Sequence, residues 1–127
     1  MLRLLLDEHV SPDVADGLRR RPKAPAAIGL AEWEDGRFLG VSDELTLAAA
    51  AEQNLTLVTY DCKTIPPLLK AWAEEGRAHG GVIFVDDKTI APSDIGGLVR
   101  ALAELARDLA KADMTDAVIF LRREKRP

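Results

Sequence analysis

The chain has 127 residues, of which 47% are apolar and 30% charged, the balance of a soluble globular protein with a single domain. Its formal net charge of −4 excludes nucleic-acid binding through bulk positive charge, but it is compatible with a nuclease whose carboxylates hold metal ions. A single cysteine excludes an internal disulfide, and no apolar run is long enough for a signal peptide or a membrane span, so we expect a cytoplasmic protein without a membrane partner.

The first half of the chain alternates apolar runs with helix-start signals. Ser11-Pro12-Asp13 combines an N-cap serine, a proline at the first helical position and an acid in the first turn. Ser42-Asp43-Glu44 repeats this chemistry, and Asn54 is expected to cap the end of the second helix. The predicted elements are a strand over 2–6, a helix from 11 to about 21, a strand over 26–30, a loop over 34–40, a helix from 42, and a strand over 55–60.

The second half continues this alternation. The predicted elements are a helix opened by Pro66 and Pro67, a strand over 82–85, a helix begun by Pro92-Ser93-Asp94, and a strand over 117–121. Strands that alternate with helices indicate an α/β protein with a mainly parallel central sheet of about five strands, covered by helices on both faces. We expect one domain over residues 1–127.

Acidic residues follow the predicted strands. Asp7 and Glu8 come directly after the first strand, and Asp61 comes after the third. In an open α/β sheet, ligands bind beyond the carboxyl ends of the strands, so these acids converge if the first and third strands are neighbours. Asp43 begins the helix that precedes the third strand, and we expect it to face the opposite edge unless the preceding loop folds over the sheet.

Converging carboxylates have a common use in proteins. They repel one another when bare, and they bind Mg²⁺ or Mn²⁺, which can activate a water for attack on a phosphodiester. A single aspartate after a strand more often caps a turn or a helix. The hypothesis of a metal site therefore depends on Asp7, Asp43 and Asp61 as a set.

Three segments, LLLDEHVSP, VSDELTLAAAAEQNLTLVTYD and HGGVIFV, resemble in order and spacing the small PIN-like domains, which are relatives of VapC-type toxin ribonucleases and of the Mut-type C-terminal domain. The resemblance covers residues 1 to 85. It implies a three-layer α/β/α fold and a Mg²⁺- or Mn²⁺-dependent ribonuclease whose metal ligands and catalytic acids are Asp7, Asp43 and Asp61. By the same match Thr59 would hold the Asp61 loop. The family also implies an RNA substrate, a small antitoxin partner and a homodimer.

The chain departs from the family pattern at two places. Lys63 and Thr64 stand where the family carries a second acid and an aromatic residue, and His9 stands where asparagine is common. Lys63 could compete with a metal for the carboxylates, or it could contact the scissile phosphate. Glu8 and His9 are further accessory candidates, His9 as a ligand or proton shuttle or as an ordinary loop residue.

Two other functions remain open from the sequence. One is a PIN-like binding module that has lost catalysis, for which Lys63 is the main support. The other is a receiver-like phosphoacceptor, with Asp61 as acceptor, Thr89 after the fourth strand and Lys125 after the fifth. Basic runs at 19–23 and 122–126 could track RNA or simply be solvated ends. Trp33 could stack a base, bind a partner or be an ordinary core anchor. Structural roles are expected for Cys62 as a half-buried residue and for His79 as a turn residue.

Overall fold

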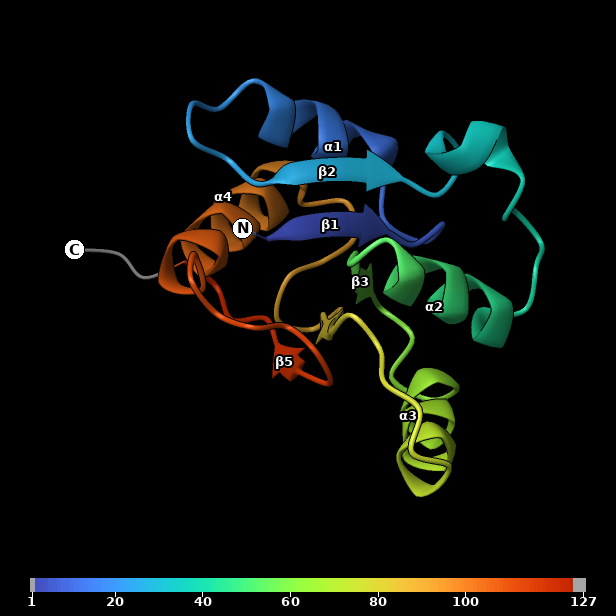
Figure 1. Ribbon diagram of the computed structural model, residues 1–127. Helices are drawn as coiled ribbons and strands as arrows, with labels where there is room; N and C mark the ends of the chain where they lie inside the picture. The colour runs from blue at the N-terminus through green and yellow to red at the C-terminus, as the bar shows by residue number, and fades with distance from the viewer. Residues whose placement is uncertain (1, 125–127) are drawn as a thin grey trace.

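The computed structural model describes residues 2–124 and contains a five-stranded sheet, in which every pair of neighbouring strands is parallel (Figure 1). The strand order is β2-β1-β3-β4-β5. The elements are β1 (Arg3–Leu6), α1 (Pro12–Arg19), β2 (Ala26–Gly29), the 3-10 helix η1 (Trp33–Gly36), α2 (Asp43–Glu52), β3 (Thr56–Thr59), α3 (Ile65–Glu74), β4 (Val82–Phe84), α4 (Ile95–Asp108) and β5 (Val118–Phe120). The predicted α/β class is confirmed.

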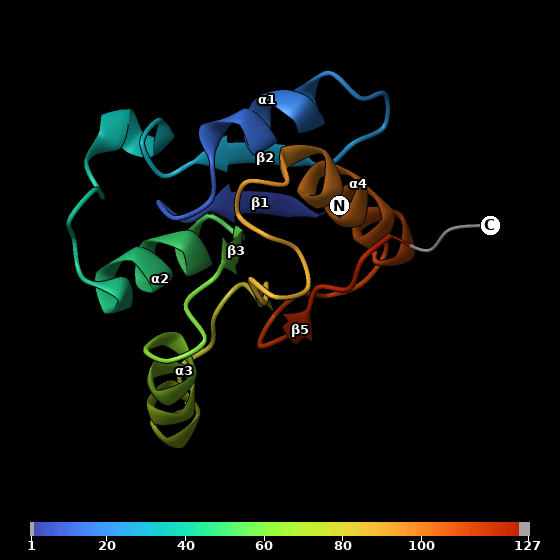
Figure 2. The ribbon, with the colours of Figure 1, turned by 180° about the vertical axis from the view of Figure 1, so that it is seen from behind.

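Helices cover both faces of the sheet, so the fold has three layers (Figures 1 and 2). Leu4 and Leu6 of β1 pack with α1 and α4, while Leu5 packs with α2 and α3 on the opposite face. All three side chains are at most 1% exposed, because a central parallel strand is buried on both sides. This burial explains why the apolar run reads as continuous rather than alternating.

The predicted helix starts are confirmed by their hydrogen bonds. Ser11 Oγ accepts a hydrogen bond from the Asp13 backbone N–H, and Ser42 Oγ accepts one from Leu45 N–H. The helix expected to reach about Arg21 ends at Arg19 instead. Arg21 precedes Pro22, and the proline ring disfavours helical backbone angles in the preceding residue, which shortens the helix.

Other boundaries differ by one or two residues. Each strand is one or two residues shorter than its apolar run, although flanking residues such as Leu30, Val85 and Leu121 still donate backbone hydrogen bonds to the neighbouring strand. The expected loop over 34–40 contains part of η1, in which Glu34 and Asp35 have left-handed φ values of 52° and 58°. α2 is capped by Gln53, and Asn54 follows it with φ of 56°. A short polar side chain tolerates this left-handed position.

Candidate functional site at the carboxyl edge of the sheet

β1 and β3 are neighbours, and their carboxyl ends meet at one edge of the sheet. Leu6 is in register with Val58, and the Asp7 backbone N–H donates to Val58 O over 3.0 Å. The strand order changes direction here, since β2 lies on one side of β1 and β3 on the other. Asp7 and Asp61 therefore flank the topological switch point, the usual ligand position in a doubly wound sheet.

The buried hydroxyl of Thr59 joins the two loops that carry these acids. Thr59 Oγ1 donates to Asp7 Oδ2 over 2.7 Å, and it accepts a hydrogen bond from the Asp61 backbone N–H over 3.0 Å. The side chain is 0% exposed, so water cannot replace either bond. Asp7 Oδ1 accepts a second hydrogen bond, from Glu8 N–H, over 2.7 Å. Thr59 thus fixes Asp7 and the start of the Asp61 loop relative to each other.

The Asp61 carboxylate is held in its ionised form. Partial burial alone would raise its pKa, but hydrogen bonds from the backbone N–H groups of Thr64 and Lys63 outweigh this effect and hold the pKa below its usual value. These bonds reach Asp61 Oδ1 over 2.7 Å and 3.0 Å. The positive charge of His9 acts in the same direction. Asp61 is therefore a carboxylate at neutral pH.

Asp43 lies at the same edge as the other two acids, so the expectation that it faces the opposite edge is wrong. A helix that connects parallel strands runs antiparallel to them, and its N-terminus consequently lies at their carboxyl ends. Burial raises the pKa of Asp43, and the negative charges of Asp7, Asp61 and Glu8 raise it further. His9 opposes them. The three predicted acids are thus electrostatic neighbours.

The three carboxylates are the ligand type that divalent cations prefer, but their side-chain positions do not surround a common site. Hard oxygen donors that repel one another are the usual ligands of Mg²⁺ and Mn²⁺. Within residues 2–124, however, no three His, Cys, Asp or Glu side chains are arranged so that they could hold one metal ion as they stand. Asp7 and Asp61 also each accept two hydrogen bonds from the protein. Coordination by all three acids requires a change of side-chain position.

The accessory candidates differ in how they act on the three acids. Glu8, His9 and Lys63 are all exposed. Lys63 acts on Asp61 through its backbone N–H, whereas the positive charge of His9 lowers the pKa of both Asp43 and Asp61. The sequence drew attention to Lys63 as the competing cation. The side chain that acts electrostatically on Asp43 and Asp61 is instead that of His9, which lowers both pKa values.

Two residues outside the site differ from their predicted roles. Cys62 is exposed overall rather than half-buried, but its thiol is partly covered, and this desolvation together with the charges of Asp86, Asp61 and Asp87 raises the pKa of the thiol. The thiolate needed for a nucleophile is therefore disfavoured.

His79 is 6% exposed and is more than a turn residue. Its Nδ1 accepts a hydrogen bond from Gly81 N–H, and its own backbone N–H donates to Asp116 Oδ1. Burial lowers the pKa of His79, which keeps the ring neutral and able to accept. Trp33 is 4% exposed and donates from Nε1 to Gln53 Oε1, which confirms its role in the core.

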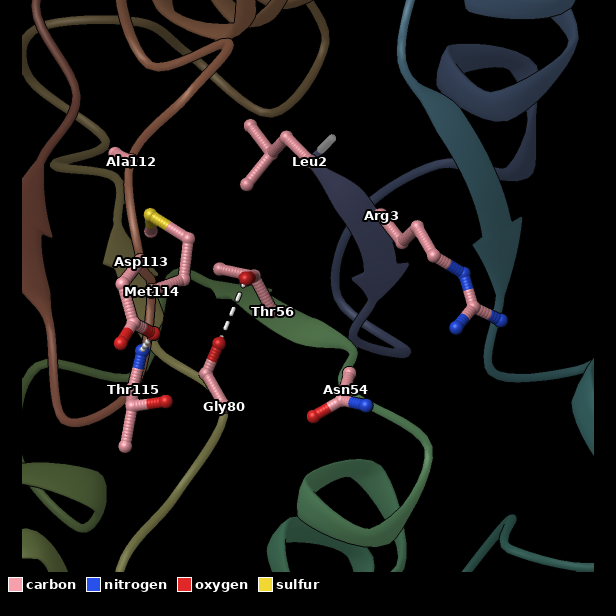
Figure 3. A pocket seen from close by; sticks show the side chains of 9 residues that line it. All are labelled: Leu2, Arg3, Asn54, Thr56, Gly80, Ala112, Asp113, Met114 and Thr115. Carbon is pink, nitrogen blue, oxygen red and sulfur yellow. Dashed lines mark hydrogen bonds between the residues drawn. The ribbon is translucent and has the colours of Figure 1, made fainter.

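A separate hollow of about 190 Å³ lies at the amino edge of the sheet, away from the acids (Figure 3). Thr56 Oγ1, at the start of β3, donates to Gly80 O across its wall. Arg3 contributes to the rim but donates to Gln53 O. Both of these polar groups are therefore used within the chain, and the place of the hollow at the amino ends of the strands is not the usual ligand position.

Comparison with known proteins yields no relative: no protein-family model, curated protein or solved structure matches the chain. No helix within residues 2–124 is long and apolar enough to cross a membrane.

Proposed function

We propose that the protein is a Mg²⁺- or Mn²⁺-dependent ribonuclease whose metal ligands are Asp7, Asp43 and Asp61. The supporting observation is that acids from three separate segments meet at the β1/β3 switch point, where Asp7 and Asp61 both raise the pKa of Asp43. This repulsion makes the bare cluster unfavourable and gives a divalent cation its binding energy. When bound, the metal supplies an activated water for phosphodiester hydrolysis.

Each residue of the chain has a distinct part in this proposal. Thr59 orients Asp7 and the Asp61 loop through its two hydrogen bonds. Backbone hydrogen bonds lower the pKa of Asp61 and so favour its ionised form, and a bound cation would offset the neighbouring charges that raise the pKa of Asp43. Lys63 is exposed and lies two residues after Asp61, so it would contact a substrate phosphate, while Glu8 and His9 act electrostatically on Asp43.

The cellular role is part of the same proposal. By its resemblance to the PIN-like toxins, the protein would act on RNA in the cytoplasm and be controlled by a small antitoxin protein. The overall negative charge means that RNA contact depends on local basic residues such as Lys63 rather than on the whole surface.

The test is a double substitution, Asp7→Asn with Asp61→Asn, compared with wild type. We expect wild-type protein to cleave single-stranded RNA only when Mn²⁺ or Mg²⁺ is present, and the double variant to lose both cleavage and Mn²⁺ binding. Calorimetric titration with Mn²⁺ separates the two losses. A wild-type protein that binds no divalent cation and cleaves no RNA would refute the proposal.

One observation favours a second candidate, a receiver-like phosphoacceptor. The strand order 2-1-3-4-5 is also that of receivers, and Asp61 follows β3 beside the acid pair Asp7 and Glu8. Thr89 is partly buried after β4, while Lys125 lies outside the described residues. Labelling of Asp61 by acetyl phosphate, with loss of the label in Asp61→Asn, would favour this candidate. A protein that binds RNA without cleaving it would instead be the binding module that has lost catalysis.

A further inference from the structure

Among residues 2–124, β5 forms one outer edge of the sheet and pairs with β4 alone. Leu121 N–H donates to Phe84 O over 2.8 Å, and Ala117 O accepts from Val82 N–H over 2.9 Å. Residues 117, 119 and 121 therefore turn their backbone groups towards β4. By the alternation of a strand, Val118 and Phe120 turn theirs outwards.

The side chains of this edge are also uncovered on one face. Phe120 is 67% exposed and Val118 is 48% exposed, although both are apolar. Phe120 stacks on Phe84 with 5.5 Å between ring centroids, which places it on the face covered elsewhere by α2 and α3. The alternate residue, Ile119, packs against the core on the other face.

A hollow of about 460 Å³ continues this apolar edge towards α3. It is lined by Leu69 and Ala73 of α3 and by Val118, with Arg77 and Asp116 among its polar residues. α3 thus stops short of β5 and leaves part of the apolar face open. Protein edges are normally protected by shortness, charged residues, prolines or covering loops, and Val118–Phe120 is short, with three residues, but carries no charge or proline.

We propose that a second copy of this chain pairs with β5 in antiparallel orientation, across a twofold axis at Ile119. This register places Val118 of each copy opposite Phe120 of the other. Both residues turn their backbone groups outwards, so they can exchange N–H···O=C bonds as a hydrogen-bonded pair. The contact is isologous, as in most homodimers.

Neighbouring registers fit worse. An axis at Phe120 would set Val118 opposite the charged Arg122, and an axis at Val118 would set Phe120 against Asp116. The axis at Ile119 pairs apolar with apolar residues. It also sets Arg122 of one copy opposite Asp116 of the other. The Asp116 side chain is 58% exposed. Opposite charges that lie across strands add to such a pairing.

The pairing has a geometric consequence for the acids. Two sheets joined antiparallel at β5 form one continuous sheet with their carboxyl edges on opposite sides. Asp7 and Asp61 lie at β1 and β3, with β4 between β3 and the interface, so both acid clusters stay open. The proposal does not rest on the ribonuclease activity, and either can fail without the other.

The test is the mass of the full chain in sedimentation equilibrium over a concentration series. We expect wild type to have twice the mass of the Phe120→Asp and Val118→Lys variants. Leu45→Asp is the matched control, because Leu45 is also an exposed apolar residue, at 60%, but lies on α2. Thermal unfolding checks that the variants remain folded.

Disulfide trapping tests the register. In a Cys62→Ser background, a mixture of Val118→Cys and Phe120→Cys proteins should form the mixed disulfide, since directly opposite residues lie within bonding range. The self-disulfides of each single variant should form several-fold less. A monomeric wild type, dimers that persist in both edge variants, or mixed and self-disulfides in equal yield would overturn the proposal. A wild type that stays monomeric would leave the β5 edge to a different protein.

Discussion

The two edges of the sheet hold their carboxylates in different ways. At the amino edge, hydrogen bonds from Thr115 lower the pKa of Asp113, and Asp116 accepts a hydrogen bond from His79 N–H. At the carboxyl edge, Asp43 is partly buried, and its pKa is raised by burial and by three neighbouring acids. The acids of the amino edge serve local turns, whereas those of the carboxyl edge are placed against one another.

This difference separates acids that stabilise their own turn from acids that suit the proposed metal site more clearly than does their position after a strand. A carboxylate whose hydrogen bonds come from its own loop stabilises that loop. A carboxylate placed among other acids is unfavourable until a cation or a proton joins it. Asp61 combines both features, since its loop hydrogen bonds keep it ionised beside Asp43.

The largest expected effect is the difference in RNA cleavage between a variant that lacks an acid at the carboxyl edge and one that lacks an acid at the amino edge. Asp61 and Asp113 both accept a backbone N–H from the residue two positions later, so they are matched in local structure. We expect Asp61→Asn to reduce Mn²⁺-dependent RNA cleavage by about a hundredfold or more. Asp113→Asn should leave cleavage unchanged. Equal rates for both variants, measured with a fluorogenic RNA, would contradict the contrast between the edges.

The next effect concerns the two buried threonines of β3. Thr59→Val leaves Asp7 Oδ2 and Asp61 N–H without their partner, and we expect the free energy of unfolding to fall by about 1–3 kcal/mol. Thr56→Val also removes a hydrogen bond, to Gly80 O, at the opposite edge. Both variants lose stability in urea titrations, but only Thr59→Val should also weaken Mn²⁺ binding. Weaker metal binding in Thr56→Val would argue against a local role for Thr59.

A smaller effect is expected from restoring an acid at position 63. Lys63→Asp replaces a cation with a carboxylate beside Asp61, and Mn²⁺ affinity should rise by about two- to fivefold, the scale of exposed charge interactions. Lys88→Asp is the control, because Lys88 stands in the same relation to Asp86 as Lys63 does to Asp61. Calorimetry with Mn²⁺ measures both, and an unchanged affinity in Lys63→Asp would show that this side chain lies too far from the metal.

The smallest expected effect is a change in how the free energy of unfolding depends on pH. Because the pKa of Asp43 is raised in the folded protein, the folded state holds this proton to higher pH than the unfolded chain, and stability falls as pH rises from 3.8 through the raised pKa. Asp43→Asn should lack this fall and gain a few tenths of a kcal/mol over wild type at pH 7 without metal.

Asp13, in the first turn of α1, is the control for Asp43. Its charge stabilises a helix N-terminus, so Asp13→Asn should lose about 0.3–1 kcal/mol at pH 7. Urea titrations across pH 3 to 8 compare the two variants. A loss of stability in Asp43→Asn at neutral pH would mean that Asp43 is mainly a helix-start acid, like Asp13.

Local chemistry made much of the fold predictable from the sequence. The serine caps before α1 and α2 and the apolar runs of β1 and β3 predicted the right elements, because they depend on neighbouring residues. The exposure of Cys62 and the burial of His79 were missed. The backbone N–H of His79 bonds Asp116, which lies 37 residues along the chain, so no local pattern indicated this contact.

The site was partly predictable for a similar reason. Asp7 and Asp61 follow directly from the carboxyl ends of neighbouring strands. Asp43 was placed at the wrong edge because the direction of its helix relative to the sheet was not taken into account. The influence of His9 on Asp43 and Asp61 depends on loop positions that no sequence pattern indicated.

The bond between Thr59 and Asp7 also bears on when the acid cluster forms during synthesis. It joins residues 52 positions apart, so it closes a long segment of chain. Parallel strand pairing over such a separation is slow, and it requires β3 to have left the ribosome. A nascent chain that ends after β2 has Asp7 without Asp61. Any chemistry of the cluster therefore begins only after β1 and β3 have paired.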